Sequence, residues 1–154
     1  MAEKASRADE ITIETAAIPE HVARCLALRV EVFIAEQGVS AADEQDGEDA
    51  ACRHWIAHRG IDTLGTLRVK NLGPEGGPGA KIQRVAIARK ARGTGLGAML
   101  MRHVTSALTP EGRPIWLESQ VSAIPFYERL GFVAEGAEFM DAGIPHRRMR
   151  LPMG

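Results

Sequence analysis

The chain has 154 residues, of which 45% are hydrophobic and 25% charged, and its formal net charge is −1. This length and composition fit one folded domain and exclude a disordered chain, while two cysteines (Cys25 and Cys52) exclude a disulfide scaffold. No apolar run reaches the roughly 18 residues of a membrane span, and residues 1–10 are too charged for a secretory signal. We therefore expect a cytoplasmic protein with no membrane partner.

The charges are unevenly spread along the chain. Five acidic residues and no basic residue lie between Asp43 and Asp49, whereas six basic residues and no acidic residue lie between Gly76 and Pro110. A basic segment favours a polyanionic ligand, and an acidic segment favours the approach of a cation. The basic segment lacks interleaved aromatic residues and a recognition motif, so we expect no nucleic-acid partner.

Hydrophobic periodicity predicts the elements of the first half of the chain. Residues 1–9 are polar and predict a frayed tail, so that a single domain would span 10–154. In chain order we expect a strand at 11–15, a helix at 18–38, a loop or short helix at 43–49, and strands at 53–59 and 63–70 joined by a hairpin turn.

The second half of the chain follows the same kind of pattern. In order we expect a loop at 71–79, a strand at 81–88, a helix that starts at Gly95 and is stopped by Pro110 and Gly112, a strand at 114–118, a helix at 122–131, and strands at 132–134 and 146–151. The resulting order, β-α-β-β-β-α-β-α-β-β, predicts a mixed α/β sheet with helices on its faces.

A glycine-rich segment lies between a predicted strand and an amphipathic helix. Its residues are Arg92, Gly93, Thr94, Gly95, Leu96 and Gly97. The N–H groups at a helix N-terminus and the helix dipole attract anions, and glycine lets a phosphate approach the backbone. Arg92 can add a charge-assisted hydrogen bond to the same oxygens. The segment therefore predicts a phosphate-binding site, although such segments are also common as plain flexible turns.

The glycine pattern of this segment is compatible with two kinds of cofactor site. The spacing Gly93-x-Gly95-x-x-Ala98 also fits the dinucleotide fingerprint, with Glu118 placed where a ribose-binding acid is expected. Four residues separate the strand from the first glycine, however, and the chain is too short for repeated βαβ units. An NAD(P)-dependent oxidoreductase is therefore the weaker alternative.

Two motifs resemble those of the GCN5-related N-acetyltransferases (GNAT family). Arg92-x-x-Gly95-x-Gly97 is similar to their acetyl-CoA signature, and the segment Phe126–Phe132 resembles their second motif. Three further segments are similar to the ElaA-like branch of the family: Leu28-Arg29-x-x-Val32-Phe33-x-x-Glu36-Gln37, Arg84-Val85, and Gly143-Ile144-Pro145-His146. The resemblance implies a central mixed, mostly antiparallel, twisted sheet flanked by helices.

The resemblance also implies a co-substrate, acetyl-CoA. We expect no metal, because the spacing of Cys25 and Cys52 matches no metal motif. It assigns the pyrophosphate to the segment 92–97 and pairs the pantetheine arm with the backbone of Val85, Ala86 and Ile87. Gln120 stands where the family often has an asparagine near coenzyme A. The function implied is direct transfer of the acetyl group from the thioester to an amine.

Catalytic roles follow from the same resemblance. Tyr127, the only tyrosine of the chain, becomes the general acid that protonates the departing thiolate; without the motif it would count as a core aromatic residue. The strand before the glycine-rich segment offers Gln83 and Arg84, neither of which is a base. Glu118 is the best remaining candidate for the general base, and a histidine such as His146 could serve instead.

The acceptor side is less well defined by the sequence. Substrate contacts are expected from Phe33, Gln37, Arg84 and His146, and the acidic stretch would suit a cationic amine. The chain could act as a monomer or a homodimer. A coenzyme A-binding module with little catalysis remains an alternative, because the usual strand carboxylate is missing.

Overall fold

A computed structural model of the chain describes residues 10–72 and 79–153. The expected tail at 1–9 and most of the expected loop at 71–79 lie outside these ranges. The chain forms two compact units: the first combines the residues up to Arg68 with Arg84–Leu100, and the second combines Val69–Gln83 with Met101–Gly154. Within the described ranges, no helix is both long and apolar enough to cross a membrane.

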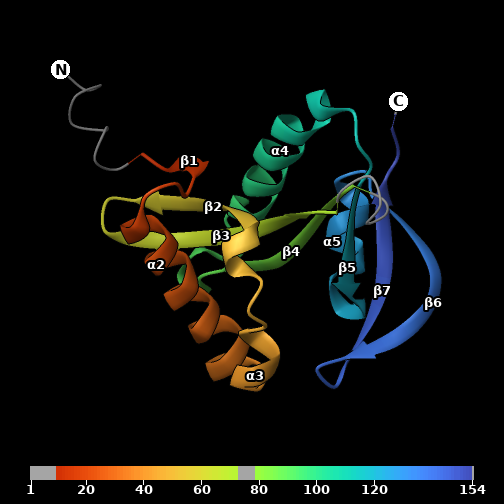
Figure 1. Cartoon of the computed structure of the whole chain (residues 1–154), viewed down its shortest axis with the longest axis horizontal. Helices are drawn as coiled ribbons and strands as arrows, with labels where there is room; N and C mark the ends of the chain where they lie inside the picture. Colours follow the sequence, from red (N-terminus) through yellow and green to blue (C-terminus); the bar gives the residue numbers. More distant parts are fainter. Residues whose placement is uncertain (1–9, 73–78, 154) are drawn as a thin grey trace. The chain divides into compact units, whose positions relative to one another are not determined.

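Seven strands form one sheet in the order β1-β2-β3-β4-β5-β7-β6, mixed and mostly antiparallel, which confirms the expected fold class (Figure 1). The strands are β1 (Thr12–Thr15), β2 (Cys52–Arg59), β3 (Asp62–Asn71), β4 (Ala80–Ile87), β5 (Ile115–Gln120), β6 (Val133–Asp141) and β7 (Ile144–Leu151). The α-helices are α2 (Pro19–Arg29), α3 (Ala41–Glu44), α4 (Leu96–Leu108) and α5 (Ile124–Arg129).

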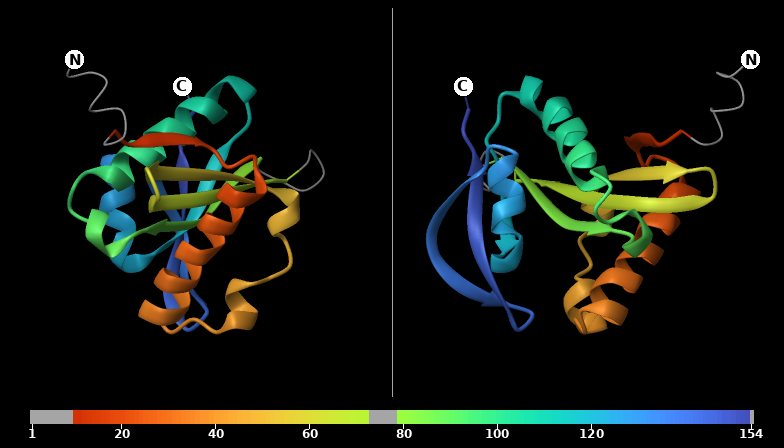
Figure 2. Two further views of the ribbon diagram at one scale, coloured as in Figure 1. Left: turned by 90° about the vertical axis from the view of Figure 1, so that its left-hand side faces the viewer. Right: turned by 180° about the vertical axis from the view of Figure 1, so that it is seen from behind.

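In the first unit, helices cover both faces of the β2–β3 hairpin. Figure 2 shows α2 on one face and the beginning of α4 on the other. On the α2 side, Cys25 packs with Ala16 and Ile56 in a buried cluster. On the α4 side, a Cβ placed on Gly65 of β3 would lie 3.5 Å from Leu96 and 3.4 Å from Leu100. This close approach fixes the start of α4 against the sheet.

The helix expected at 18–38 is an α-helix in its first part and a π-helix in its second part. The α-helix ends at Arg29 and continues as a π-helical segment over Val30–Glu36, where the N–H of Gln37 donates to the carbonyl of Val32 at 3.2 Å. Val30, Val32 and Ile34 are β-branched and crowd the preceding turn of an α-helix. The chain is therefore helical over most of the expected range, but its second part is π-helical.

The second unit is organised around β5. β5 pairs in parallel with β4 from Ala80 to Ile82 and antiparallel with β7 along its whole length. β6 and β7 form a hairpin whose turn residues, Ala142 and Gly143, have φ values of 52° and 75°, as a type I′ turn requires. β6 is longer than expected, because a register shift between Glu135 and Phe139 hides the strand alternation in the sequence.

Candidate functional site: a glycine-rich helix start and a polar strand face

In the first unit, the glycine-rich segment forms the turn that leads into α4. Gly93 and Gly95 have φ values of 77° and 88°, and no atom lies within 4 Å of a Cβ placed on either glycine. The first turn of α4 contains no acidic residue. Its free backbone N–H groups and the positive end of the helix dipole are therefore available to an anion, which supports the predicted phosphate site.

The guanidinium group of Arg92 already has partners inside the first unit. It donates to Glu36 Oε1 at 2.6 Å and to the carbonyl of Ile87 at 3.0 Å. Glu36, at the end of the π-helical segment, was part of the ElaA-like pattern but was not singled out as a site residue. Arg92 thus ties this segment to the end of β4, and the backbone of 93–97 is the part of the turn left open to a ligand.

Arg84 interrupts the regular geometry of β4 immediately before Val85, Ala86 and Ile87. Its φ of 56° is costly for a residue with a side chain, by about 1–2 kcal/mol. Hydrogen bonds of the guanidinium group offset the free-energy cost of this backbone conformation. The group donates to Glu44 Oε2 at 3.1 Å, to Asp46 Oδ2 at 3.3 Å, and to the backbone carbonyls of Asp43 and Glu44. These hydrogen bonds join the Arg84 side chain to the acidic stretch; its expected contact with substrate stays a prediction.

The acidic stretch is paired internally with three arginines. Glu44, only 2% exposed, bonds Arg29 at 2.8 Å, and Asp49 bonds both Arg29 and Arg68. Hydrogen bonds from Arg68 hold the pKa of Asp46 well below its usual range, and bonds from Arg29 and Arg68 lower the pKa of Asp49 against the effect of burial. These three acids therefore do not form the open acidic rim expected for an amine.

Phe33 and Gln37, two expected substrate contacts, lie on and just after the π-helical segment. Phe33 is half-buried and packs against a cluster that includes Leu28 and Ala86. Gln37 is exposed. The structure thus brings Phe33 onto the same stretch of β4 whose backbone is expected to pair with pantetheine. Such π-helical segments are frequent at functional sites.

In the second unit, three expected site residues share one face of the sheet. Glu118 and Gln120 are two positions apart on β5 and therefore lie on the same face of the sheet. Gln120 lies directly opposite His146 of β7. Glu118 is paired with Lys81 at 2.9 Å. His146 stacks on Phe139, and its Nδ1 lies 2.7 Å from the carbonyl of Ile144. Since a carbonyl only accepts, this bond puts the proton on Nδ1 and leaves the Nε2 lone pair available.

Tyr127 lies in the second unit, on α5. Its ring is 8% exposed and makes edge-to-face contacts with Phe126 and Phe132 at centroid distances of 5.0 and 6.0 Å. Burial raises the pKa of the phenol, so it is fully protonated at neutral pH. Among the described residues the hydroxyl has no hydrogen-bond partner, which leaves its proton free for another group.

The sequence profile of the acetyltransferase (GNAT) domain matches residues 14–153. The chain belongs to the GNAT acetyltransferase family. It is 32% identical over 124 residues to the uncharacterized N-acetyltransferase YjcF of Bacillus subtilis (strain 168), covering 79% of this chain and 86% of that protein. Family membership assigns it to the acyl-CoA N-acyltransferases.

Three solved structures have the same fold as this chain. An acyl-CoA N-acyltransferase from Pseudomonas aeruginosa aligns with a TM-score of 0.80 and 30% identity, over 93% of this chain and 99% of that one. Escherichia coli ElaA aligns with a TM-score of 0.82 and 23% identity, over 93% and 100%. An acetyltransferase from Bacillus subtilis, solved in complex with CoA, aligns over 92% and 98% with a TM-score of 0.67 and 16% identity.

The fold also removes the dinucleotide alternative. A dinucleotide-binding domain has a mostly parallel, doubly wound sheet, with the glycine-rich turn following its first strand. Here the glycine-rich turn follows β4, and the sheet is mostly antiparallel. The spacing of Gly93, Gly95 and Ala98 therefore arises from a GNAT motif that overlaps the dinucleotide fingerprint.

Proposed function

We propose that the chain is an acetyl-CoA-dependent N-acetyltransferase that moves the acetyl group directly from the thioester to an amine. The observation that carries the proposal is the helix start at α4, where two glycines with positive φ expose unpaired backbone N–H groups within a GNAT-family chain. The pyrophosphate of coenzyme A binds there, at residues 92–97.

The pantetheine arm extends along β4 and pairs with the backbone of Val85, Ala86 and Ile87. The positive φ at Arg84 directly precedes these residues, and Phe33 packs against this part of the strand. An extended chain that carries amides is well matched by the N–H and C=O groups of a strand. Gln120, at the end of β5, contributes a polar group near coenzyme A.

Tyr127 acts as the general acid. Its buried, protonated phenol, which has no hydrogen-bond partner within residues 10–72 and 79–153, donates to the thiolate of coenzyme A as the thioester bond breaks. Direct transfer is supported by the cysteines, because burial raises the pKa of both Cys25 and Cys52 and neither is a ready nucleophile.

The amine proton passes to the polar face that carries Glu118 and His146. The carboxylate of Glu118 is engaged in an ion pair with the Lys81 ammonium group at 2.9 Å. His146 has its Nδ1 proton directed at a carbonyl and its Nε2 lone pair available. We therefore favour His146 as the base, with the Glu118 carboxylate attracting the charged amine.

A thiol-release assay with acetyl-CoA tests the proposal. The amines are a polyamine, an amino sugar, an amino-acid derivative and a peptide amine, and release above the hydrolysis rate with at least one of them is expected. Isothermal titration calorimetry without amine measures acetyl-CoA binding. No binding at high micromolar acetyl-CoA would refute the proposal, whereas binding without release to any amine would favour a coenzyme A-binding module.

A matched pair of glycine variants localises the cofactor. Gly95 and Gly112 both have positive φ (88° and 70°), with open space at the Cβ position, so Gly95→Ala and Gly112→Ala carry a similar backbone strain. Only Gly95 lies on the proposed pyrophosphate turn. We expect Gly95→Ala to weaken acetyl-CoA binding about tenfold or more, and Gly112→Ala to leave it unchanged, by calorimetry. Equal affinities in the two variants would move the pyrophosphate elsewhere.

A further inference from the structure

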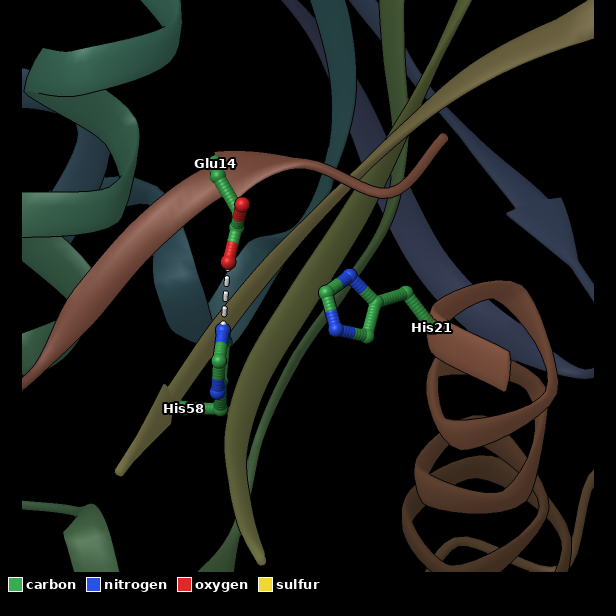
Figure 3. Close-up of side chains that lie close together, drawn as sticks. All are labelled: Glu14, His21 and His58. Atoms are coloured by element: carbon green, nitrogen blue, oxygen red, sulfur yellow. Dashed lines mark hydrogen bonds and ion pairs between the residues drawn. The ribbon is translucent and has the colours of Figure 1, made fainter. Parts of the chain in front are cut away.

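A cluster of three metal-ligating side chains lies in the first unit, on residues to which the GNAT motifs assign no role. Glu14 comes from β1, His58 from β2, and His21 from the first turn of α2 (Figure 3). In the β1–β2 register Glu14 pairs with Ile56 and Thr12 with His58, so Glu14 and His58 are diagonal neighbours on one face. The buried cluster of Ile56 with Cys25 puts α2, and with it His21, on this same face.

The three side chains converge on a common point. Their ligand atoms all lie within 4.8 Å of one another, and each residue is half-buried. His58 Nε2 is 2.7 Å from Glu14 Oε2, and the rings of His21 and His58 are 5.2 Å apart between centroids. Ligand atoms about 2.0–2.2 Å from a tetrahedral Zn²⁺ lie roughly 3.3 Å from one another. Small side-chain rotations therefore suffice, and the Glu14 side chain, 42% exposed, is free to make them.

We propose that Glu14, His21 and His58 form a binding site for a divalent transition-metal ion, with Zn²⁺ as the best match. Two imidazoles and one carboxylate are ligands that zinc uses with one position left to water. Ca²⁺ and Mg²⁺ prefer shells made of oxygen atoms, so they are excluded by the two nitrogens. The ion replaces the hydrogen bond between His58 and Glu14 and joins β1, α2 and β2.

No metal was expected from the sequence, where the spacing of the two cysteines matches no metal motif. The three ligands found here are spread over 44 positions and follow no spacing motif either. The affinity expected is micromolar. His58 Nδ1 is buried and has no partner in the part of the chain that the structure describes, so the usual second hydrogen bond that orients a histidine ligand is missing there.

Calorimetry on the full-length chain, without a histidine tag and stripped with a chelator, tests the site. We expect one equivalent of Zn²⁺ to bind, no binding of Mg²⁺, and visible absorption bands of tetrahedral type when Co²⁺ is added. At a hundredfold excess over its Kd, Zn²⁺ should raise the Tm by about 5–10 °C.

Three variants and two controls make the assignment specific. Glu14→Gln, His21→Asn and His58→Asn should each weaken Zn²⁺ binding at least tenfold. His103→Ala, which removes an exposed histidine of α4, and Cys52→Ser, which removes the less buried thiol, should bind as the parent chain does. Circular dichroism verifies that each variant is folded.

Two outcomes would overturn the proposal. The first is that the parent chain binds neither Zn²⁺ nor Co²⁺, a result that does not depend on any variant being folded. The second is that binding survives in both histidine variants and disappears in Cys52→Ser, which would move the ion to a thiol. Acetyl-CoA binding and thiol release are measured separately, so neither outcome bears on the acetyltransferase proposal.

Discussion

At the scale of single residues, the environment of a side chain decides its chemistry more than its type does. The chain has one tyrosine, and its ring is enclosed by two phenylalanines, so that burial raises the pKa of the phenol. Arg92 forms an ion pair with Glu36, and Arg84 forms ion pairs with Glu44 and Asp46 of the acidic stretch. These ion pairs hold in place the backbone of β4 and of the glycine-rich turn, where we propose that coenzyme A binds.

Tyr127→Phe isolates the role of the hydroxyl group. The phenylalanine ring keeps both aromatic contacts, so the free energy of unfolding should change by less than about 0.5 kcal/mol. We expect kcat in the thiol-release assay to fall about 10²–10⁴-fold, with the affinity for acetyl-CoA unchanged, because a general acid contributes on this scale.

Phe132→Leu is the matched control for the hydroxyl variant. It keeps the hydroxyl group and removes an aromatic contact, and it should lower stability more than kcat. If Tyr127→Phe retained the parent kcat, the thiolate would be protonated by another group, such as water, and Tyr127 would be a packing residue.

At the scale of elements, the acidic stretch with α3 holds β4 in its irregular shape. Glu44 Oε2 accepts from Arg29 Nε at 2.9 Å and from Arg84 Nε at 3.1 Å, and it is the common partner of the helix and the strand. Ser40 caps α3 by accepting from the N–H of Asp43, which fixes where Glu44 points. A short helix of four residues thereby acts as a support for the strand.

Glu44→Gln tests this support. Removing the charge leaves the buried Arg29 with Asp49 alone and takes an anionic partner from Arg84, so we expect a loss of about 3–5 kcal/mol in urea unfolding. Acetyl-CoA binding should weaken as well, because β4 then loses part of what maintains the backbone at Arg84. Asp43→Asn, at an exposed neighbour, should change stability by less than about 0.5 kcal/mol. Similar losses in both variants would contradict a specific role for Glu44.

At the scale of the whole molecule, the paired aspartates couple stability to pH. The pKa values of Asp46 and Asp49 are lower in the folded chain than the unfolded value of about 4. Their contribution is therefore fully present above about pH 4 and is lost as the pH falls through the folded values. The free energy of unfolding should be nearly constant from pH 7 to about 5 and should decline below about pH 4.

Asp46→Asn should reduce this decline. We expect the variant to be less stable by about 1–3 kcal/mol at pH 7, and its stability to approach that of the parent chain in acid. Urea unfolding at a series of pH values measures both effects. Asp141→Asn, at an exposed carboxylate of β6, should follow the parent curve. A constant difference between Asp46→Asn and the parent at every pH would contradict the coupling.

Much of the fold was predictable because its signals are local. The strand alternation, the helix at α4 and the glycines at 93 and 95 can all be recognised within a few residues of one another, and the family resemblance implied a mixed, mostly antiparallel sheet. The partners of Arg29, Arg84 and Arg92 lie 15 to 56 positions away, so no local pattern predicts them. The same is true of the cluster of Glu14, His21 and His58.

The ion pairs of the acidic stretch also have a consequence for folding kinetics. Glu44 and Arg84 are separated by 40 positions, so their contact requires the closure of a long loop, and we expect it to form late, with the assembly of β2, β3 and β4. Contacts that form after the rate-limiting step slow unfolding and leave the folding rate almost unchanged. The acidic stretch should therefore control how long the native state persists rather than how fast it is reached.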